Sequence, residues 1–446
     1  MAAYTFETVT PSQALAFTSG DMLSFSQGTA IQASAVYDAN GDVTVSVGAL
    51  SVEFSGSLVA ASQLGYFNFL DGSHLYIGDS GDNIRSLQQD SHAGAFFGGP
   101  GNDSFTFGIA GGVAQGNQGD DNLAALGGLA TLYGGQGDDV LTANGANDFI
   151  QGNKGNDFIN GGTHDTILGG QGDDFINRGN GILDGNLGND RIIGGGLLMG
   201  EDGNDFISGT GTVGGFDTIL GGNGDDQLDS TTIGAVSGAS MDGGEGNDTI
   251  EGGQAADTLV GGNGDDRLSD TGGKNQLLDG GEGANTITAI GGSGTIVGGA
   301  GDDVISVQST TSRYTINAGG GDDTITASGG PDVITGGGGG DRFILVAGAT
   351  TPGMAPQILD WSGAVDKLSF RGFTPNPSDY ASATASDYST AVDTATRLTT
   401  QNHFSFVAVQ VGGDLIVFAG GSGGLTSVVD LVGRSLADFD PTHNLI

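Results

Sequence analysis

A nine-residue pattern of glycine and aspartate repeats through the middle of this 446-residue chain. It begins as GGPGNDSFT at Gly98–Thr106 and returns as GNQGDDNLA from Gly116 and GGQGDDVLT from Gly134. Fourteen copies occur, 15 to 22 residues apart and most often 18 apart. Their first residues are Gly98, Gly116, Gly134, Gly152, Gly169, Gly185, Gly200, Gly221, Gly243, Gly261, Gly280, Gly298, Ala318 and Gly336. This periodicity predicts a stacked solenoid, because each repeat can bury its apolar side only against its neighbours.

Each 18-residue period contains two halves, and each half places a large apolar residue at the same point. Alternation around these residues predicts very short strands with one inward side chain. The eighth residues of the copies are Phe105, Leu123, Leu141, Ile159, Ile176, Ile192, Ile207, Leu228, Ile250, Leu268, Ile287, Ile305, Ile325 and Phe343. The matching residues between copies are Leu132, Ile150, Ile167, Leu183, Ile219, Leu259, Leu278, Ile296, Ile316 and Ile334. We therefore expect an all-β fold of two parallel sheets around a thin apolar core. The glycine–aspartate turns form one edge (the motif edge) and the intervening segments form the other (the opposite edge).

The sixth residue of the copies is aspartate in all but one case, Asn285. The aspartates are Asp103, Asp121, Asp139, Asp157, Asp174, Asp190, Asp205, Asp226, Asp248, Asp266, Asp303, Asp323 and Asp341. Stacked parallel strands repeat every ~4.8 Å, so these carboxylates are expected about that far apart. At an effective dielectric of 20, each neighbouring pair would repel by roughly 3–4 kcal/mol. A cation between the carboxylates would turn this repulsion into attraction.

Composition indicates the same kind of ligand. The net charge is −41, and 47 of the 53 acidic residues are aspartate. Short carboxylates and backbone carbonyls beside tight turns are the oxygen ligands that Ca²⁺ takes, and glycine permits the positive φ and close backbone approach such turns need. The charge excludes the basic face that nucleic-acid binding requires. The absence of cysteine excludes disulfides and thiolate metal sites.

The repeat resembles the GGxGxDxUx signature of RTX (repeats-in-toxin) proteins, in which U is a large apolar residue. The resemblance covers about residues 98–344. It implies a parallel β-roll in which the first six residues of each copy form a turn. Multiple Ca²⁺ ions would then lie between stacked turns, held by the aspartate side chains and backbone carbonyls. The alternative is that each aspartate only caps its turn, but a ladder of thirteen favours metal binding.

The opposite edge keeps few acidic turns and reads instead as AGGVAQ, LGGLATL, STTIGAVSGAS or VQSTTSRYT. Aspartate remains at plausible turn positions at Asp148, Asp165, Asp217, Asp257 and Asp332. Metal binding and turn capping both stay open for these five residues. Asp148 and Asp165 are the best metal candidates because they lie on adjacent coils.

Three domains are expected: residues 1–74, the roll at 75–345, and residues 346–446. In the first, the alternating runs at Val43–Val47 and Val52–Phe54 predict a small antiparallel β domain. This domain either covers the open end of the solenoid core, which such folds need, or binds a ligand or surface. Leu75–Ile84 (LYIGDSGDNI) reads as an atypical first coil.

The C-terminal segment changes pattern. Tyr388, Ala391, Ala395 and Leu398 fall on one face of a predicted helix, and VAVQVGGDLIVF reads as a strand–turn–strand. That hairpin and the tail with Asp438 and Asp440 resemble the uncleaved type I secretion signal of proteobacterial RTX chains. No Lys or Arg precedes Arg85 and no apolar run reaches 18 residues. We therefore expect neither a cleavable secretory signal nor a membrane span.

No catalytic motif is evident. The histidines 74, 92, 164, 403 and 443 form no HExxH motif, and Gly420–Gly424 matches GxSxG only within a glycine run. We interpret the chain as a non-enzymatic, extracellular or surface-attached Ca²⁺-binding protein of a Gram-negative bacterium that folds on binding Ca²⁺. It resembles the calcium-binding portion of alphaproteobacterial surface-layer proteins, and we expect it to self-assemble. The alternatives are a monomeric adhesin that binds a glycan or cell through residues 1–74, and an enzyme of unrecognised type.

Overall fold

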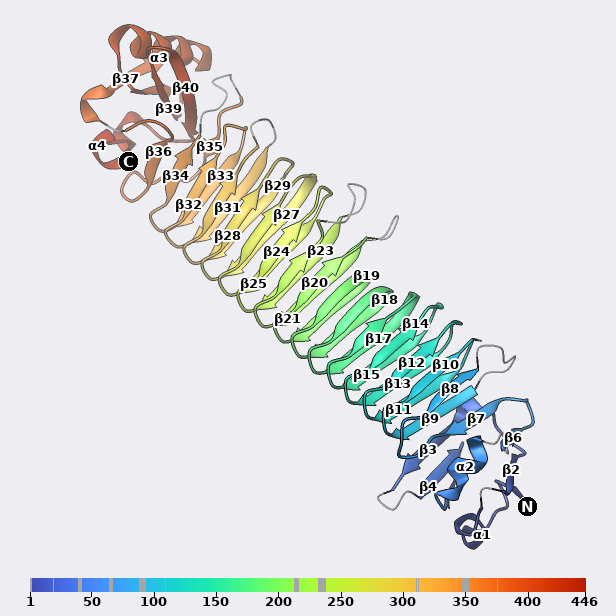
Figure 1. The fold of residues 1–446 in the computed structure, drawn as a ribbon. Helices are drawn as coiled ribbons and strands as arrows, with labels where there is room; N and C mark the ends of the chain where they lie inside the picture. The colour runs from blue at the N-terminus through green and yellow to red at the C-terminus, as the bar shows by residue number, and fades with distance from the viewer. Residues whose placement is uncertain are drawn as a thin grey trace. The chain divides into compact units, whose positions relative to one another are not determined.

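The computed structural model is an all-β parallel solenoid, as the repeat predicts (Figure 1). It describes residues 2–18, 20–38, 42–63, 67–87, 94–108, 110–211, 216–231, 238–309, 311, 313–346, 353–374 and 376–446. Residues 232–237 of the STTIGAVSGAS stretch and His92 therefore lie outside the described residues. The chain forms two compact units, Met1–Ser208 and Gly209–Ile446, each of which is described by itself.

In the first unit, each coil contributes one strand to a sheet that leads into the motif edge and one to a sheet that follows it. The leading strands are β7 (His74–Ile77), β9 (Gly94–Pro100), β11 (Val113–Gln118), β13 (Thr131–Gln136), β15 (Phe149–Lys154) and β17 (Thr163–Gln171). The following strands are β8 (Ile84–Leu87), β10 (Ser104–Phe107), β12 (Asn122–Ala125), β14 (Val140–Ala143) and β16 (Phe158–Asn160). Strand β7 pairs with β9 and β8 with β10, so the predicted atypical first coil is part of the stack.

Three further strands complete this stack: β18 (Phe175–Leu187), β19 (Arg191–Asp202) and β20 (Phe206–Gly209). Strands β18 and β19 run without interruption from the following sheet into the leading sheet, because their coils are only 16 and 15 residues long. The shortened opposite edge therefore has no separate turn at these two coils.

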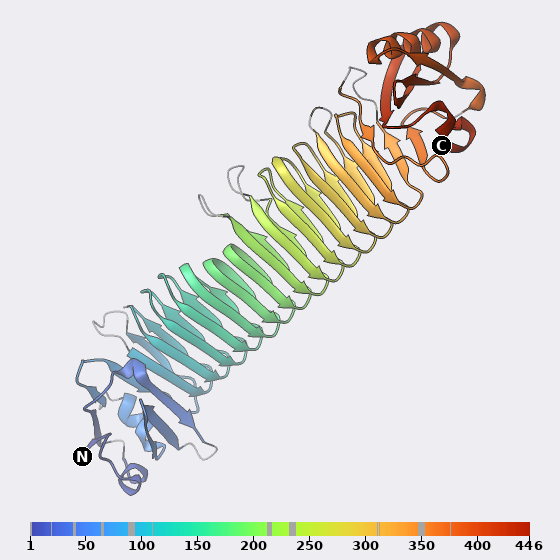
Figure 2. The ribbon, with the colours of Figure 1, turned by 180° about the vertical axis from the view of Figure 1, so that it is seen from behind.

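The second unit repeats the arrangement (Figure 2). Its leading strands are β21 (Asp217–Asn223), β23 (Ala239–Glu245), β25 (Thr258–Asn263), β27 (Lys274–Glu282), β29 (Ser293–Ala300), β31 (Tyr314–Gly320), β33 (Val333–Gly338) and β35 (Gln357–Ile358). Its following strands are β22 (Gln227–Asp229), β24 (Thr249–Gly252), β26 (Arg267–Asp270), β28 (Thr286–Ala289), β30 (Val304–Val307), β32 (Thr324–Ala327), β34 (Arg342–Leu345) and β36 (Lys367–Phe370).

Equivalent residues of successive coils stack on one another in both units. Leu123 pairs with Leu141, for example, and Ile287 with Ile305. All the predicted inward residues of both half-periods are buried. The pattern missed Ala114, Leu198 and Met241, which are also fully buried in the same column. Each large buried side chain contributes about 1.5–3 kcal/mol.

The N-terminal cap is more mixed than the sequence predicts. The antiparallel sheet is present as β3 (Ala33–Tyr37), β4 (Val43–Val47) and β5 (Leu50–Phe54). A second, parallel sheet of β1 (Ala3–Thr5), β2 (Met22–Phe25) and β6 (Phe67–Phe69) was not predicted, nor were α1 (Pro11–Leu15) and α2 (Ser57–Gln63). The core of the cap continues into Ile77 and Phe97 of the first coils, so the cap covers this end of the stack.

The C-terminal cap confirms the predicted helix and hairpin. Helix α3 (Tyr388–Asn402) buries Ala391 and Ala395 against an antiparallel sheet. That sheet contains β38 (Phe406–Val411), β39 (Asp414–Gly421) and β40 (Gly424–Leu431), with β37 (Tyr380–Ala385) parallel to β38. Strand β40 pairs with β35, which joins the cap to the last coils. The last helix is α4 (Pro441–Asn444).

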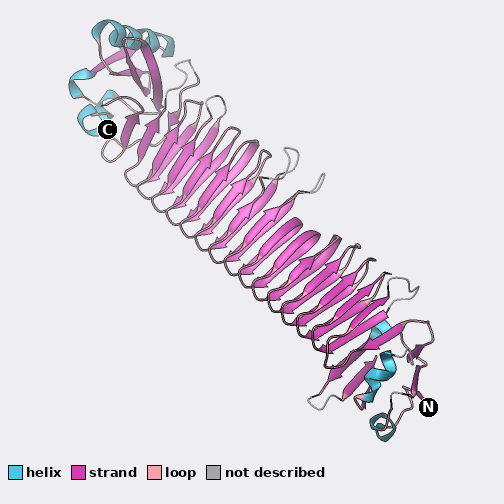
Figure 3. Cartoon of the chain, viewed as in Figure 1, coloured by secondary structure: helices cyan, strands magenta, loops and turns pink. Residues whose placement is uncertain are grey.

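Helices are confined to the two caps within the described residues (Figure 3). In that part of the chain, no helix is long and apolar enough to cross a membrane.

Candidate metal centre

The turns of the motif edge are tight because glycine leaves room for an aspartate oxygen. A Cβ added to Gly116, the first residue of its copy, would lie 1.9 Å from Asp121 Oδ2 and 2.6 Å from the carbonyl oxygen of Gly134. Gly137, the fourth residue of its copy, has a φ of 124° and would collide with the backbone of the preceding turn. The glycine positions of the motif thus create a pocket for the sixth-position carboxylate.

The sixth-position aspartates form a hydrogen-bonded ladder along the motif edge of each unit. Within each unit, Oδ1 of a sixth-position residue accepts a hydrogen bond from the backbone N–H of the sixth residue in the preceding coil. In the first unit these bonds join Asp103, Asp121, Asp139, Asp157, Asp174, Asp190 and Asp205 over 2.7–2.8 Å. In the second they join Asp226, Asp248, Asp266, Asn285, Asp303, Asp323 and Asp341 over 2.8–3.1 Å.

The second carboxylate oxygen is buried without a hydrogen-bond partner in ten ladder aspartates. These are Asp103, Asp121, Asp139, Asp157, Asp174, Asp190, Asp248, Asp266, Asp303 and Asp323. A buried carboxylate oxygen with no compensating partner is strongly unfavourable. One oxygen of each residue therefore holds the neighbouring turn, and the other is available for a ligand.

Burial also raises the pKa of the ladder carboxyls. Desolvation is the main cause, and neighbouring carboxylates often add to it. It raises the pKa of Asp139 and Asp174 to about 8, and the pKa of Asp121 to about 7. In the folded protein, burial thus disfavours the ionised form of these carboxyls at neutral pH when no cation is bound to them.

A second ladder lies beside the first and was missed by the sequence analysis. The fifth residue of the copies is Asn or Asp in twelve of fourteen cases. Its Oδ1 accepts from the N–H of the fifth residue in the following coil, over 2.7–3.0 Å. The two ladders therefore run in opposite directions along the stack. The recurrence of Asn or Asp at this position was the signal available in the sequence.

Two residues outside the fourteen copies extend the first ladder. Asn83 donates its N–H to Asp103 Oδ1 at 2.8 Å in the atypical first coil. Asp366 accepts from the N–H of Asp341 at 3.1 Å. The ladder therefore continues one coil beyond the recognisable motif at each end.

The opposite edge reproduces parts of this geometry. Asp148 and Asp165 lie on adjacent coils as predicted, and the Asp148 N–H donates to Asp165 Oδ1 at 2.9 Å. Asp148 Oδ2 is buried without a partner, whereas Asp165 Oδ2 accepts from the Gly162 N–H. Asp332 accepts from the Tyr314 N–H at 2.9 Å and its Oδ2 is also buried without a partner.

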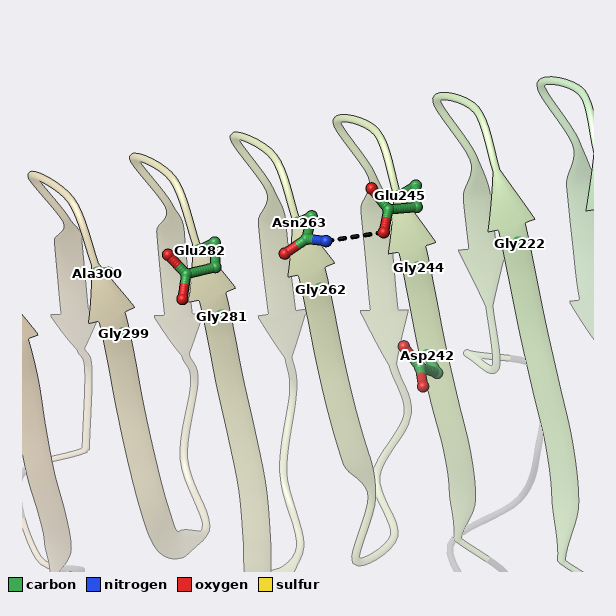
Figure 4. Close-up of a pocket in the computed structure, with 10 residues that line it drawn as sticks. All are labelled: Gly222, Asp242, Gly244, Glu245, Gly262, Asn263, Gly281, Glu282, Gly299 and Ala300. Carbon is green, nitrogen blue, oxygen red and sulfur yellow. Dashed lines mark hydrogen bonds between the residues drawn. The ribbon is translucent and has the colours of Figure 1, made fainter.

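A shallow groove of about 580 Å³ lies on the outer face of the leading sheet in the second unit (Figure 4). Its floor is the glycine backbone of successive coils, from Gly222 to Gly299. Glu245, Glu282 and Asp242 stand on its surface, and Asn263 Nδ2 donates to Glu245 Oε1 at 2.7 Å. The groove is acidic and open, so it adds to the negative surface of the sheet.

The chain matches the family model of the RTX calcium-binding nonapeptide repeat. The matched residues are 115–148, 133–163, 142–176, 163–182, 199–231, 240–269, 270–305 and 315–351. This protein belongs to the RTX repeat family. It is thus a calcium-binding β-solenoid that takes multiple Ca²⁺ ions.

Two other comparisons add little to this RTX assignment. No curated protein matches the chain. A similar solved structure is described as a hyperactive, Ca²⁺-dependent, β-helical antifreeze protein from an Antarctic bacterium, with 17% identity and a TM-score of 0.32. The match covers 80% of this chain and 96% of the other.

The ladder residues fit the calcium ions that the RTX family implies. The donors are hard oxygens, which Ca²⁺ prefers, and the buried Oδ2 atoms are the ones left unbonded. A bound cation would neutralise carboxylates that burial otherwise forces towards protonation. Asn285 is the weakest position in the ladder, because its amide carries no charge.

Proposed function

We propose that this RTX protein is a secreted, non-enzymatic structural protein that folds when Ca²⁺ binds outside the cell. The row of buried carboxylate oxygens without hydrogen-bond partners carries the proposal. Closing the motif edge places these oxygens out of water, so the fold is unfavourable until a cation reaches them. At the low calcium concentration of a cytosol the chain stays unfolded. At roughly 0.1–1 mM Ca²⁺, the range of extracellular modules, it folds.

The ions would be held by the thirteen sixth-position aspartates together with backbone carbonyls, and on the opposite edge by Asp148 and Asp165. Far-ultraviolet circular dichroism tests the folding step. We expect a mostly disordered spectrum in excess chelator and a β spectrum after calcium is added. A β spectrum that persists without calcium would contradict the proposal.

Export is the second element of the proposal. The hairpin β38–β39 and the tail resemble the C-terminal signal of RTX chains that leave by type I secretion. A chain that is unfolded inside the cell would suit a narrow export channel, and calcium outside would then fold it. Deletion of residues 346–446 should abolish export by a host type I system, whereas deletion of residues 1–74 should leave export intact.

Self-assembly is the third element, and the opposite edge supports it. Leu126 and Leu129 are 43% and 64% exposed there, among small uncharged residues. Such a surface can approach another copy without removing charges from water. The solenoid has a cap at each end, which favours lateral contacts between copies over end-to-end contacts. We propose a surface layer, filament or matrix component, as in the alphaproteobacterial surface-layer proteins that the repeat resembles.

Light scattering and electron microscopy at millimolar Ca²⁺ test assembly. We expect wild type to form filaments or sheets and a Leu129→Asp/Ser293→Asp variant to stay monomeric. Leu129 has a φ of 62°, a conformation that Asp tolerates better than Leu, so the substitution should not disturb the turn. Leu187→Asp, at a 45% exposed position on the motif edge, is the matched control and should still assemble. A monomeric wild type would instead favour an adhesin that binds a glycan or cell surface through residues 1–74.

A further inference from the structure

A pair of buried carboxylates lies on the opposite edge of the second unit, away from the fourteen motif turns. Asp257 and Asp270 are 2% and 0% exposed, on neighbouring coils. Asp257 ends the turn that follows β24, and Asp270 is the last residue of β26. Asp270 was not among the residues that the repeat pattern marks.

The oxygens of the two carboxylates converge on one point. A Cβ added to Gly252 would lie 2.9 Å from Asp270 Oδ2 and 3.1 Å from Asp257 Oδ2. The register pairs Gly252 with Asp270 across β24 and β26. On the motif edge the same space is shared by an aspartate oxygen and a glycine carbonyl of the next coil. Here the Asp270 side chain replaces that carbonyl.

Hydrogen bonds hold both carboxylates in place but leave one oxygen unused. Asp257 accepts from the N–H groups of Ala239 and Gly253 at 2.7 and 2.9 Å. Asp270 Oδ1 accepts from the Gly272 N–H at 2.9 Å and from Gln276 Nε2 at 2.6 Å. Asp270 Oδ2 is buried without a hydrogen-bond partner and faces Asp257.

Tyr314 completes the surroundings of this pair. Its hydroxyl contacts Gln276 Oε1 at 2.7 Å, so a chain of contacts runs from Tyr314 through Gln276 to Asp270. Gln276 and Tyr314 are themselves buried. The strongest charge acting on Asp270 is that of Asp257, which is also negative. Two fixed carboxylates of like charge, with one oxygen unbonded, form a site for a cation.

We propose that Asp257 and Asp270 together bind one Ca²⁺ ion at a site separate from the motif ladder. In the register, Asp270 pairs with Ala289, which in turn pairs with Val307, so an acidic residue in this inward column is unusual. The ion would bind the two carboxylates across the edge, where calcium-binding turns are otherwise scarce. The proposal rests on calcium binding by the repeats but not on secretion or assembly.

Native mass spectrometry of the full chain in Ca²⁺ counts the bound ions. We expect Asp270→Asn and Asp270→Ala to bind one ion fewer than wild type. Asn keeps an acceptor for Gly272 and Gln276, and Ala matches the residue one coil further on, so both variants should fold. Asp279→Asn, on the partly exposed outer face of β27, is the matched control and should bind the wild-type number. An unchanged count in both Asp270 variants would overturn the proposal.

A second measurement uses only the wild-type chain and does not depend on a folded variant. Crystals grown with Tb³⁺ in place of Ca²⁺ should show an anomalous peak between Asp257 Oδ2 and Asp270 Oδ2. Peaks along the motif edge without one here would refute this site alone. Absence of peaks at both places would refute the calcium ladder as well.

Discussion

Replacing Asp139 separates the two roles of a ladder carboxylate. Its Oδ1 accepts from the Asp121 N–H at 2.7 Å, and its Oδ2 is buried without a hydrogen-bond partner. Asp139→Asn keeps the acceptor but removes the charged oxygen, whereas Asp139→Ala removes both. Asn285 shows that an amide fits this column, because it accepts from the Asp266 N–H at 2.8 Å.

The two substitutions should differ in size. Loss of one carboxylate ligand should weaken calcium binding at that turn by about tenfold or more, which lowers calcium-linked stability by about 1.4 kcal/mol. Asp139→Asn should lose that amount at saturating calcium. Asp139→Ala should lose a further ~1–3 kcal/mol, because the Asp121 N–H is left buried and unbonded.

Urea unfolding at saturating Ca²⁺, followed by circular dichroism, measures both losses, and the calcium midpoint of folding gives an independent reading. Asp120→Asn is the matched control, since it makes the same chemical change at the fifth position, where Asn102 and Asn156 already occur. It should leave the calcium midpoint unchanged. If Asp139→Asn behaves like wild type while Asp139→Ala is destabilised, the ladder aspartates only cap their turns and the metal assignment is wrong.

Three further outcomes are expected. Asn285→Asp should add calcium-binding capacity, seen as a higher ion count and a lower calcium midpoint; no change would argue against the sixth position as a ligand. Asp248→Ala should impair calcium-induced folding more than Asp332→Ala, because Asp248 is hydrogen-bonded to the ladder aspartates Asp226 and Asp266, whereas Asp332 accepts from the N–H of Tyr314, which has no carboxylate; equal effects in dichroism titrations would contradict our assignment of the edges. Burial raises the pKa of Asp174 from 3.8 to about 8 in the folded state. The calcium-free fold is therefore most stable below pH 4, where this carboxyl is protonated in both the folded and the unfolded chain, and it loses stability as the pH rises towards 8. Calcium-free protein should therefore gain β signal on acidification from pH 8 to 5, and a spectrum independent of pH would refute this.

The repeat predicts the architecture because a solenoid coil is a local structure. Each inward residue, such as Leu123 or Ile305, contacts its equivalents one period away, so spacing alone places it in the core. The caps follow no period. The parallel pairing of β1, β2 and β6 joins segments far apart in the chain, and nothing in their residues specifies that partner choice.

The site was predicted by residue type but not by atom. The sequence offered a choice between turn capping and metal binding. In ten ladder aspartates, one carboxylate oxygen accepts a backbone hydrogen bond of a neighbouring turn, and the other is buried without a hydrogen-bond partner. The position of Asp270 could not be predicted, because it depends on the register between β24 and β26. The assignment of individual aspartates as ligands and the domain boundaries at 74/75 and 345/346 stay predictions.

The two Asx ladders make most coils interchangeable, because the same two contacts recur from coil to coil. In the twelve copies with Asn or Asp at the fifth position, the motif turn has the side-chain acceptors for both ladders, whichever motif turn lies next to it. Removal of residues 116–133 would bring the turn of Gly134 against that of Gly98, where Asp139 could accept from the Asp103 N–H and Asn102 from the Asp138 N–H. After loss or duplication of one full period, each strand therefore still pairs with a strand of its own sheet. Deletion of half a period would instead place a strand of the leading sheet against a strand of the following sheet. The length of such a chain can drift over evolutionary time in steps of one coil, with its caps and its chemistry intact.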